Sequence, residues 1–412
     1  MQLQIKPGLR RVWREVGTLQ IGLSRRRGTV IAGLTAADVP LIDQLRDGVD
    51  ASVFEADDDG LEAARRRELV GLLTEAGVLV GTGIGRRVRE GLGMAAERLV
   101  PDAAVWSLVH PDVGDGWGLL AARASRRVLI SGAGRLGSTV ASTLAAAGVG
   151  ELLVADQRRV TAGDLAPGEA GRPDLGRPRE EAALDAVRRF GSRAERAGPG
   201  ALSGSGGPST GRAEHGSAAD RPDLVVLIEH GAADATAAGR LVSADQAHLS
   251  VVIREDDILV GPLVRPGSGP CLRCLDLHRG DRDPAWPSVL AQLLSPASGT
   301  LQPEETAAST LAAGLVALQV LAQLDGVAEP ATAGATLEIE LPDGLIARRS
   351  WPAHPSCGCH WPPQASGTGQ DQTTAGDESV TARDPRGSSA DQRGDPSSAG
   401  ARLGPPTRTM EP

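Results

Sequence analysis

The sequence contains no tyrosine and a single lysine, and these absences narrow the chemistry open to the chain. Aromatic residues make up 2% of the 412 residues, and Lys6 is the only lysine, so the remaining Lys+Arg positions are all arginine. No lysine in the body of the chain can clamp a phosphate or form a Schiff base, so arginine must supply any fixed positive charge. An NAD(P)-dependent oxidoreductase would likewise find no tyrosine or lysine for proton transfer.

Long apolar runs and a basic charge balance are also missing. No uninterrupted apolar run reaches the roughly 18 residues of a membrane span. The N-terminal stretch MQLQIKPGLRRVW has no apolar signal-peptide core. The net charge of −9 argues against a general nucleic-acid binder. We therefore expect a cytoplasmic protein with neither a nucleic acid nor a membrane as partner.

The first part of the chain has the pattern of a small separate domain. Its length suggests two or three domains in all. Within residues 1–90, short strands are predicted at 17–23 and 28–34 and a helix at 35–48. The segment 59–80 is predicted to form a second helix that ends at Gly77, followed by a strand-like VLV. This order is typical of a winged-helix-like α+β module. The alternative interpretation is a dimerisation or capping domain.

The rest of the chain divides by composition. Residues 91–127, with Trp106 and Trp117, read as a linker, and residues 128–361 read as the main α/β domain. Residues 193–222 are rich in Gly, Ser and Pro, which predicts a flexible insertion. Residues 362–412 carry almost no large apolar side chains, so we expect a disordered tail.

A glycine-rich turn marks the start of the α/β domain. The strand-like VLIS is followed by GAGRLG, an alanine-rich helix and the strand ELLVAD, which ends on Asp156. Gly132, Gly134 and Gly137 have the G-x-G-x-x-G spacing that lets a backbone approach a phosphate at a helix N-terminus. The order strand, turn, helix, strand and acid predicts a Rossmann-type nucleotide site. The alternative is a glycine turn that serves only helix–sheet packing.

Four cysteines form two close pairs that are far apart in the chain. Cys271 and Cys274 are spaced CxxC, whereas Cys357 and Cys359 are spaced CxC. This pattern predicts a tetrahedral four-thiolate zinc site with no open position, hence a structural one. The alternative is a set of reduced free thiols.

Several sequence motifs of the chain resemble those of the ThiF/MoeB/ubiquitin-activating-enzyme superfamily. The matching features are the glycine turn, the AGVG that precedes the second strand, Asp156 followed by Val160, the CxxC and the final cysteine pair. The resemblance spans about 128–361. It implies a Rossmann-like fold with a mixed sheet and helices on both faces, a structural zinc, and a homodimer. It also implies binding of ATP and Mg²⁺ and adenylation of a carrier protein's C-terminal carboxylate. The ATP-binding residues it implies are Gly132, Gly134, Arg135, Gly137, Asp156 and Arg179.

The chain departs from the superfamily at several catalytic positions. In the segment that normally reads Asn-Leu-x-Arg-Gln, Leu165 survives but Pro167 and Gly168 replace the Arg and Gln. Arg179 stands at the lysine position, and His230 stands where an Asp holds Mg²⁺. Glu229 or Asp234 could replace that acid, and His278, His354 or His360 could replace a strained cysteine at the zinc. Losing the acid, the Arg and the Lys together suggests weak or absent adenylation.

The N-terminal stretch PGLRRVWREVGTLQIGLSRRRGTVIAGL (7–34) resembles the start of ThiF-like cyclodehydratase partner proteins from azoline-forming ribosomal-peptide pathways. That resemblance implies a domain that grips a precursor peptide as an added strand and hands it to a separate catalytic protein. The first hypothesis is therefore a degenerate scaffold that binds a precursor peptide or small carrier protein. The second is an active adenylyltransferase, and the third, an NAD(P)-dependent oxidoreductase, leaves the cysteines unexplained.

Overall fold

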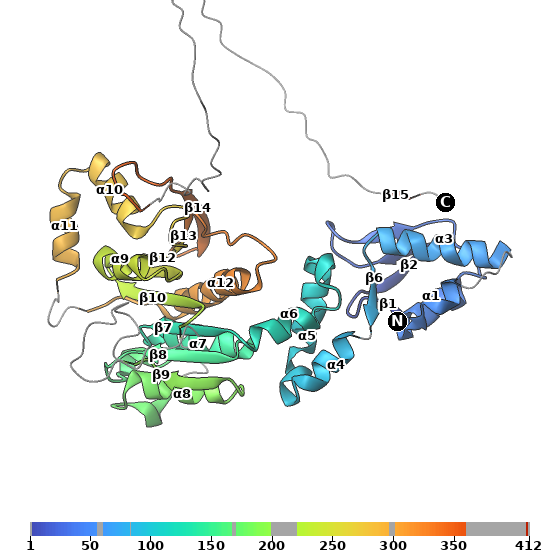
Figure 1. The fold of residues 1–412 in the computed structure, drawn as a ribbon, viewed down its shortest axis with the longest axis horizontal. Helices are drawn as coiled ribbons and strands as arrows, with labels where there is room; N and C mark the ends of the chain where they lie inside the picture. The colour runs from blue at the N-terminus through green and yellow to red at the C-terminus, as the bar shows by residue number, and fades with distance from the viewer. Residues whose placement is uncertain are drawn as a thin grey trace, which may run out of the picture.

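The computed structural model describes residues 2–55, 61–82, 84–166, 170–198, 221–295, 301–359 and 409–410. A small N-terminal module lies at one end of the molecule, and helices α4, α5 and α6 lie between it and a larger α/β domain (Figure 1). Pro167, Gly168, His360 and most of the predicted insertion and tail lie outside the described residues.

One mixed sheet of eight strands forms the frame of the α/β domain. Its order is β14-β13-β12-β11-β10-β7-β8-β9. The bounds are β7 (Arg127–Ser131), β8 (Glu151–Ala155), β9 (Arg193–Arg196), β10 (Leu224–His230), β11 (His248–Ile253), β12 (Asp257–Val264), β13 (Ala335–Glu340) and β14 (Leu345–Ser350). Strands β7 to β11 pair in parallel, whereas β12, β13 and β14 pair antiparallel. The central strands read as continuous apolar runs because both faces of the sheet are covered.

Helices cover both faces of this sheet, which confirms the predicted fold class. On one face, α7 (Arg135–Ala146), α8 (Arg179–Arg188) and α12 (Thr306–Asp325) pack on strand residues such as Val128 and Val226. On the other face, α9 (Ala235–Ser243) and α10 (Leu272–Arg282) pack on Leu129 and Val225. Alternate residues of one strand thus enter different cores. Helix α11 (Trp286–Leu293) follows α10.

The N-terminal module has two small sheets around one apolar core. One has the order β5-β1-β6, and the other is built from β2, β3 and β4. The bounds are β1 (Gln2–Ile5), β2 (Arg11–Glu15), β3 (Thr18–Ile21), β4 (Thr29–Ile31), α1 (Val39–Asp47), β5 (Val49–Asp50), α2 (Ser52–Glu55), α3 (Leu61–Glu75) and β6 (Leu79–Thr82). The first predicted helix starts later than residue 35. Asp38 accepts hydrogen bonds from the backbone and hydroxyl of Thr35, which closes a turn before the helix.

Residues 91–127, which were predicted to be a linker, are mostly helical. They include α5 (Met94–Val109), a short 3₁₀ turn and α6 (Trp117–Arg123), while α4 (Ile84–Gly91) ends at the first of them. Arg123 lies 2.6 Å from Asp325 of α12, and both side chains are 1% exposed. The Arg123 guanidinium also lies over the Trp106 ring, 4.9 Å from its centroid. A buried ion pair therefore joins α6 to the core of the α/β domain.

Two short strands lie in segments for which no structure was predicted. Arg193–Arg196 form β9, which pairs with β8, so the insertion starts later than residue 193. Thr409–Met410 form β15, which pairs in parallel with β4. Each short strand pairs with a strand that would otherwise be at the edge of its sheet. The unpaired backbone groups of such an edge cannot be predicted from the composition of the segment that pairs with it.

Among the described residues, one helix, α12, is long and apolar enough to cross a membrane by length and composition. Its most apolar window is 56% buried inside the protein, where it packs on α7 and the sheet. This is the usual arrangement of a core helix.

Candidate functional site

The glycine turn connects β7 to α7 with two glycines that no other residue could replace without strain. Gly132 has a φ of +97°, and a Cβ there would lie 2.6 Å from the Ile228 carbonyl oxygen. A Cβ on Gly137 would lie 1.8 Å from the Gly132 carbonyl oxygen. The turn therefore keeps the tight backbone geometry of a phosphate-binding loop. At Gly134, an added Cβ would meet Asp164 and Arg179 at ordinary contact distance.

Asp156, at the end of β8, is buried and fully engaged by protein donors. One of its oxygens accepts the Ala133 backbone N–H at 2.8 Å, and the Arg158 guanidinium donates to both oxygens at 3.0 Å. Burial raises the pKa of the carboxyl, but hydrogen bonds from Arg158 and from Ala133 outweigh it, so the pKa is lower than usual. The acid predicted to hold a ribose thus stays ionised and already has an arginine partner.

Arg179 and Arg135 both lie at the turn, and both are bonded to protein groups. Arg179, the first residue of α8, donates to the Asp164 carboxylate at 3.0 and 2.7 Å and lies 3.5 Å from Asp156. Arg135 donates to the backbone oxygens of Glu304 and Gly163 and to the Thr306 hydroxyl. The structure therefore brings the six residues of the predicted ATP site together.

Glu304 was not predicted from the sequence, yet it occupies the N-terminus of α7. Its Oε1 accepts the Leu136 backbone N–H at 2.9 Å and the Ser309 hydroxyl at 3.0 Å. Its Oε2 lies 3.3 Å from His230 Nε2. Burial raises the pKa of Glu304, but the contacts with His230 and Ser309 outweigh it and lower the pKa overall. A carboxylate of the chain itself thus takes the helix N–H that an anionic ligand would use.

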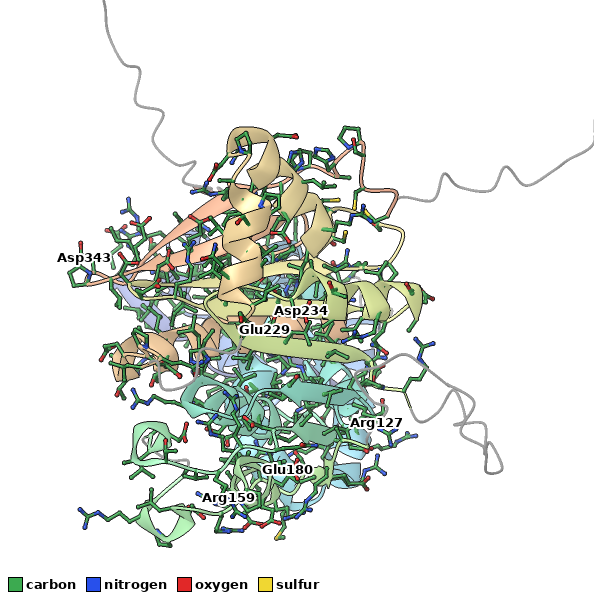
Figure 2. All side chains as sticks on the ribbon, turned by 90° about the vertical axis from the view of Figure 1, so that its left-hand side faces the viewer. Arg127, Arg159, Glu180, Glu229, Asp234 and Asp343 are labelled. Carbon is green, nitrogen blue, oxygen red and sulfur yellow. The ribbon has the colours of Figure 1, made fainter. Side chains whose placement is uncertain are left out.

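The two acids that could replace the missing Mg²⁺ ligand lie side by side at the end of β10 (Figure 2). Glu229 accepts the Asp234 backbone N–H at 3.1 Å through one oxygen, and its other oxygen is buried with no partner among the described residues. Burial raises the pKa of Glu229 to about 7. The Asp234 carboxylate caps α9 by accepting the backbone N–H groups of Thr236 and Ala237. One acid is thus only partly ionised at neutral pH, and the other is used in a helix cap.

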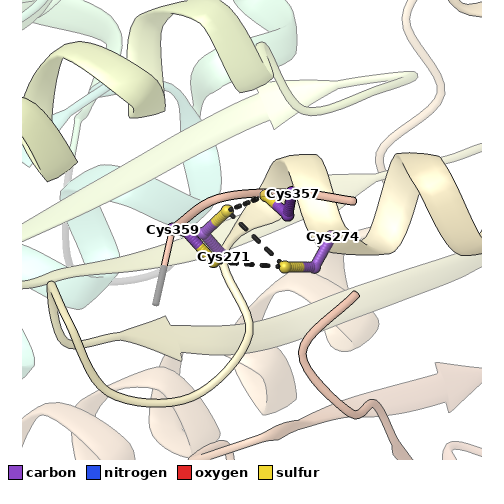
Figure 3. Close-up of side chains that lie close together, drawn as sticks. All are labelled: Cys271, Cys274, Cys357 and Cys359. Atoms are coloured by element: carbon purple, nitrogen blue, oxygen red, sulfur yellow. Dashed lines mark hydrogen bonds between the residues drawn. The ribbon is translucent and has the colours of Figure 1, made fainter. Parts of the chain in front are cut away.

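The four cysteines come from two segments of the α/β domain and lie close together (Figure 3). Cys271 precedes α10 and Cys274 lies in its first turn, whereas Cys357 and Cys359 follow β14. The Sγ–Sγ distances are 3.9 Å for Cys271–Cys274, 3.5 Å for Cys271–Cys357 and 3.3 Å for Cys274–Cys359. A tetrahedral zinc with Zn–S bonds of about 2.3 Å requires sulfur atoms about 3.8 Å apart. The donor type, number and spacing fit a four-thiolate zinc.

The thiol pKa values describe a cluster that needs a cation to ionise fully. Burial raises the pKa of Cys274, but backbone N–H groups of His354 and Cys271 hydrogen-bond its sulfur and bring the pKa below the usual range. Burial and the neighbouring thiols raise the pKa of Cys359 to about 11 and that of Cys357 further. Four thiolates at this distance repel one another unless a metal ion offsets their charge.

Histidine does not replace a cysteine in the described part of the cluster. His278 Nε2 lies 3.0 Å from the Pro352 carbonyl oxygen, to which it can donate. His354 accepts the Ser356 backbone N–H through Nδ1, so its ring proton is assigned to Nε2, which lies 2.9 Å from Asp281 Oδ2. His354 therefore supports the loop that carries Cys357 and does not replace a sulfur ligand of the cluster.

Comparisons with known proteins agree with this geometry. The profile of the ThiF family matches residues 115–360, more than half of the chain. Escherichia coli MccB, crystallised with MccA, is 14% identical with a TM-score of 0.61, over 87% of this chain and 99% of that one. MccB crystallised with ATP is 15% identical with a TM-score of 0.60, over 88% of this chain and 100% of that one.

PaaA is 17% identical, with a TM-score of 0.57 over 83% of this chain and 98% of that one. At these identities the structural matches establish the fold alone. No curated protein sequence matches the chain. The profile match, the mixed sheet with its glycine turn and the four-cysteine cluster together show that the chain belongs to the ThiF family.

Proposed function

We propose that this ThiF-family chain is a catalytically degenerate scaffold. It would bind a precursor peptide or small carrier protein for modification by a separate enzyme in ribosomal peptide biosynthesis. The observation that carries the proposal is Glu304, whose carboxylate occupies the N-terminus of α7. An ATP phosphate that approached the same N–H would meet a negative charge held by Leu136, Ser309 and His230.

The cations and acids around the turn support the same proposal. Arg158 and Arg179 already offset the charges of Asp156 and Asp164, so binding a nucleotide would require these ion pairs to rearrange. At the end of β10, His230 replaces the metal-binding acid. Nucleotidyl transfer depends on a cation that offsets the phosphate charge. Of the two acids that could replace the metal-binding acid, Glu229 has a raised pKa of about 7 and Asp234 caps α9.

The N-terminal module would be the peptide-binding part. Strand β4 would be the edge of its small sheet, but β15 covers that edge by pairing in parallel with Val30 and Ile31, so a peptide would add here in place of β15. An edge of this kind can accept a peptide as an added strand. The structural neighbour MccB, described as a microcin C7 biosynthetic enzyme, was crystallised in complex with MccA. This likeness supports a partner for the present chain without naming it.

We also infer a structural zinc held by Cys271, Cys274, Cys357 and Cys359, which would join the last strands to α10. A homodimer in the cytoplasm is proposed by family resemblance. Exposed apolar side chains support an interface on α12 and β14, where Leu318 is 56% and Leu345 67% exposed.

The alternative function is an active adenylyltransferase for the C-terminal carboxylate of a small carrier protein. The intact turn at Gly132 and Gly137 favours it, and MccB was also crystallised with ATP. ATP–pyrophosphate exchange separates the two functions. The assay would use the zinc-loaded chain and a peptide encoded beside its gene. The scaffold predicts peptide binding with exchange no faster than without protein, whereas exchange that depends on the peptide carboxylate would establish the alternative.

A further inference from the structure

A separate cavity of about 450 Å³ lies between the N-terminal module and α5, and no residue of the glycine turn or cysteine cluster lines it. This volume is within the range of roughly 300–1,000 Å³ that is usual for ligand sites. Its walls come from the β1–β2 and β3–β4 connections, the α3–β6 turn and the end of α5. The lining residues used below are Leu9, Arg10, Leu23, Arg26, Val105 and Leu108.

The two walls of the cavity are held together by hydrogen bonds. The ammonium group of Lys6, the only lysine, is buried and donates to the Ser107 carbonyl oxygen of α5 at 2.7 Å. Arg27, in the β3–β4 connection, donates to the Val109 carbonyl oxygen at 3.4 Å. These two charge-assisted hydrogen bonds join the N-terminal module to α5 beside the cavity.

The lining combines exposed apolar side chains with free positive charge. Leu23 is 65% exposed and Val105 is 53% exposed, so apolar surface faces solvent here. Arg10 and Arg26 line the same cavity, and neither has a carboxylate partner among the described residues. The described residues that line the cavity include no Asp or Glu. A local cluster of arginine on a chain of net charge −9 indicates an anionic partner.

We propose that this cavity binds a segment of the precursor peptide in which an apolar side chain is flanked by acidic residues. The apolar side chain would fill the space between Leu23, Val105 and Leu108, and the flanking carboxylates would pair with Arg10 and Arg26. The small volume suits a short segment better than the face of a folded protein. The cavity adjoins the connection that leads into β4 at Thr29, so one peptide could contact both the β4 edge and the cavity.

This inference rests on the proposed function, and it adds the sequence class of the peptide. The test begins with display selection of random peptides on the zinc-loaded full chain. Selected peptides are then labelled, and their affinities are measured by fluorescence anisotropy. The variants are Arg10→Glu/Arg26→Glu and Val105→Asp, with Arg14→Glu on the exposed face of β2 as the matched charge control. Because all four side chains are exposed, unchanged melting temperatures are expected.

The expected result is a selected motif of Asp or Glu around one apolar residue. Its affinity should fall about tenfold or more in Arg10→Glu/Arg26→Glu and in Val105→Asp, and should stay unchanged in Arg14→Glu. Peptides that bind all variants equally would overturn the cavity proposal and leave the β4 edge as the peptide site. A failure to select any peptide would contradict both this inference and the proposed scaffold function.

Discussion

The glycine turn and the cysteine cluster belong to one domain but differ in what they retain. At the turn, the tight backbone geometry is present, while Glu304, Arg158 and Arg179 are each bonded to neighbouring groups of the protein. At the cluster, four sulfur donors stand at zinc-compatible distances, and no described protein cation offsets their charge. Protein groups thus offset the charges at the turn, whereas the sulfur atoms of the cluster are spaced to hold a metal ion.

This difference shows that a backbone turn and the ligand it could bind are separate features of a site. A turn filled by protein side chains can hold β7 and α7 together without a nucleotide. If the four sulfur atoms hold a metal, its removal takes away the stability that metal binding contributes to the fold. The comparison predicts that removing zinc lowers the thermal stability of the protein and that removing a nucleotide does not.

The largest expected effect comes from removing one sulfur ligand. Cys274→Ser should abolish stoichiometric zinc binding, because this sulfur is buried within the cluster. If only 5 kcal/mol of metal-linked stability is lost, the melting temperature should fall by about 10–20 °C. Zinc content and thermal unfolding measure both. Ser356→Ala, on the loop that carries Cys357, keeps its backbone N–H and should behave as wild type. An equal melting temperature for Cys274→Ser would show that the cluster does not stabilise the fold.

A smaller effect is expected at Glu229, beside the turn. Burial raises its pKa from 4.5 to about 7, so between these values the folded protein holds a proton that the unfolded chain has lost. Wild-type stability should therefore decrease as pH rises through this window, by up to about 3 kcal/mol. Glu229→Gln is neutral at every pH, so its stability relative to wild type should increase from pH 5 to pH 8. Urea unfolding that shows parallel pH profiles would contradict the assignment.

The smallest effect on stability is expected at Asp281, which orients His354 next to the cluster. Asp281→Asn weakens that contact, so zinc affinity should fall by about 10–100-fold without loss of stoichiometry. Chelator competition measures the affinity. Asp283→Asn, an exposed acid just after α10, is the control. Equal affinities for the two variants would mean that the His354 contact does not shape the site.

The sequence alone was sufficient to predict the strands, the turn and the cysteine pairs that form the backbone of both sites. Apolar runs such as 224–228 predicted the central strands, and glycine spacing predicted the turn, because these features follow from local backbone requirements. The paired spacing of the cysteines predicted their convergence in the same way.

The occupancy of the turn could not be predicted from the sequence. Glu304 reaches Leu136 from a segment 168 residues away, and that separation leaves no periodic signal. Arg123 likewise pairs with Asp325 across the domain, so a segment that reads as a linker forms helices anchored in the core. Contacts of this kind depend on tertiary packing.

The most direct test of the comparison is calorimetric titration with Mg·ATP of zinc-loaded wild type and Glu304→Ala, with Gln302→Ala as the control. If Glu304 fills the anion site, wild type and control should release no binding heat, and Glu304→Ala should bind ATP measurably. Micromolar binding by wild type would contradict the account and favour the adenylyltransferase. A Glu304→Ala variant that also fails to bind would show that this carboxylate is not what closes the turn.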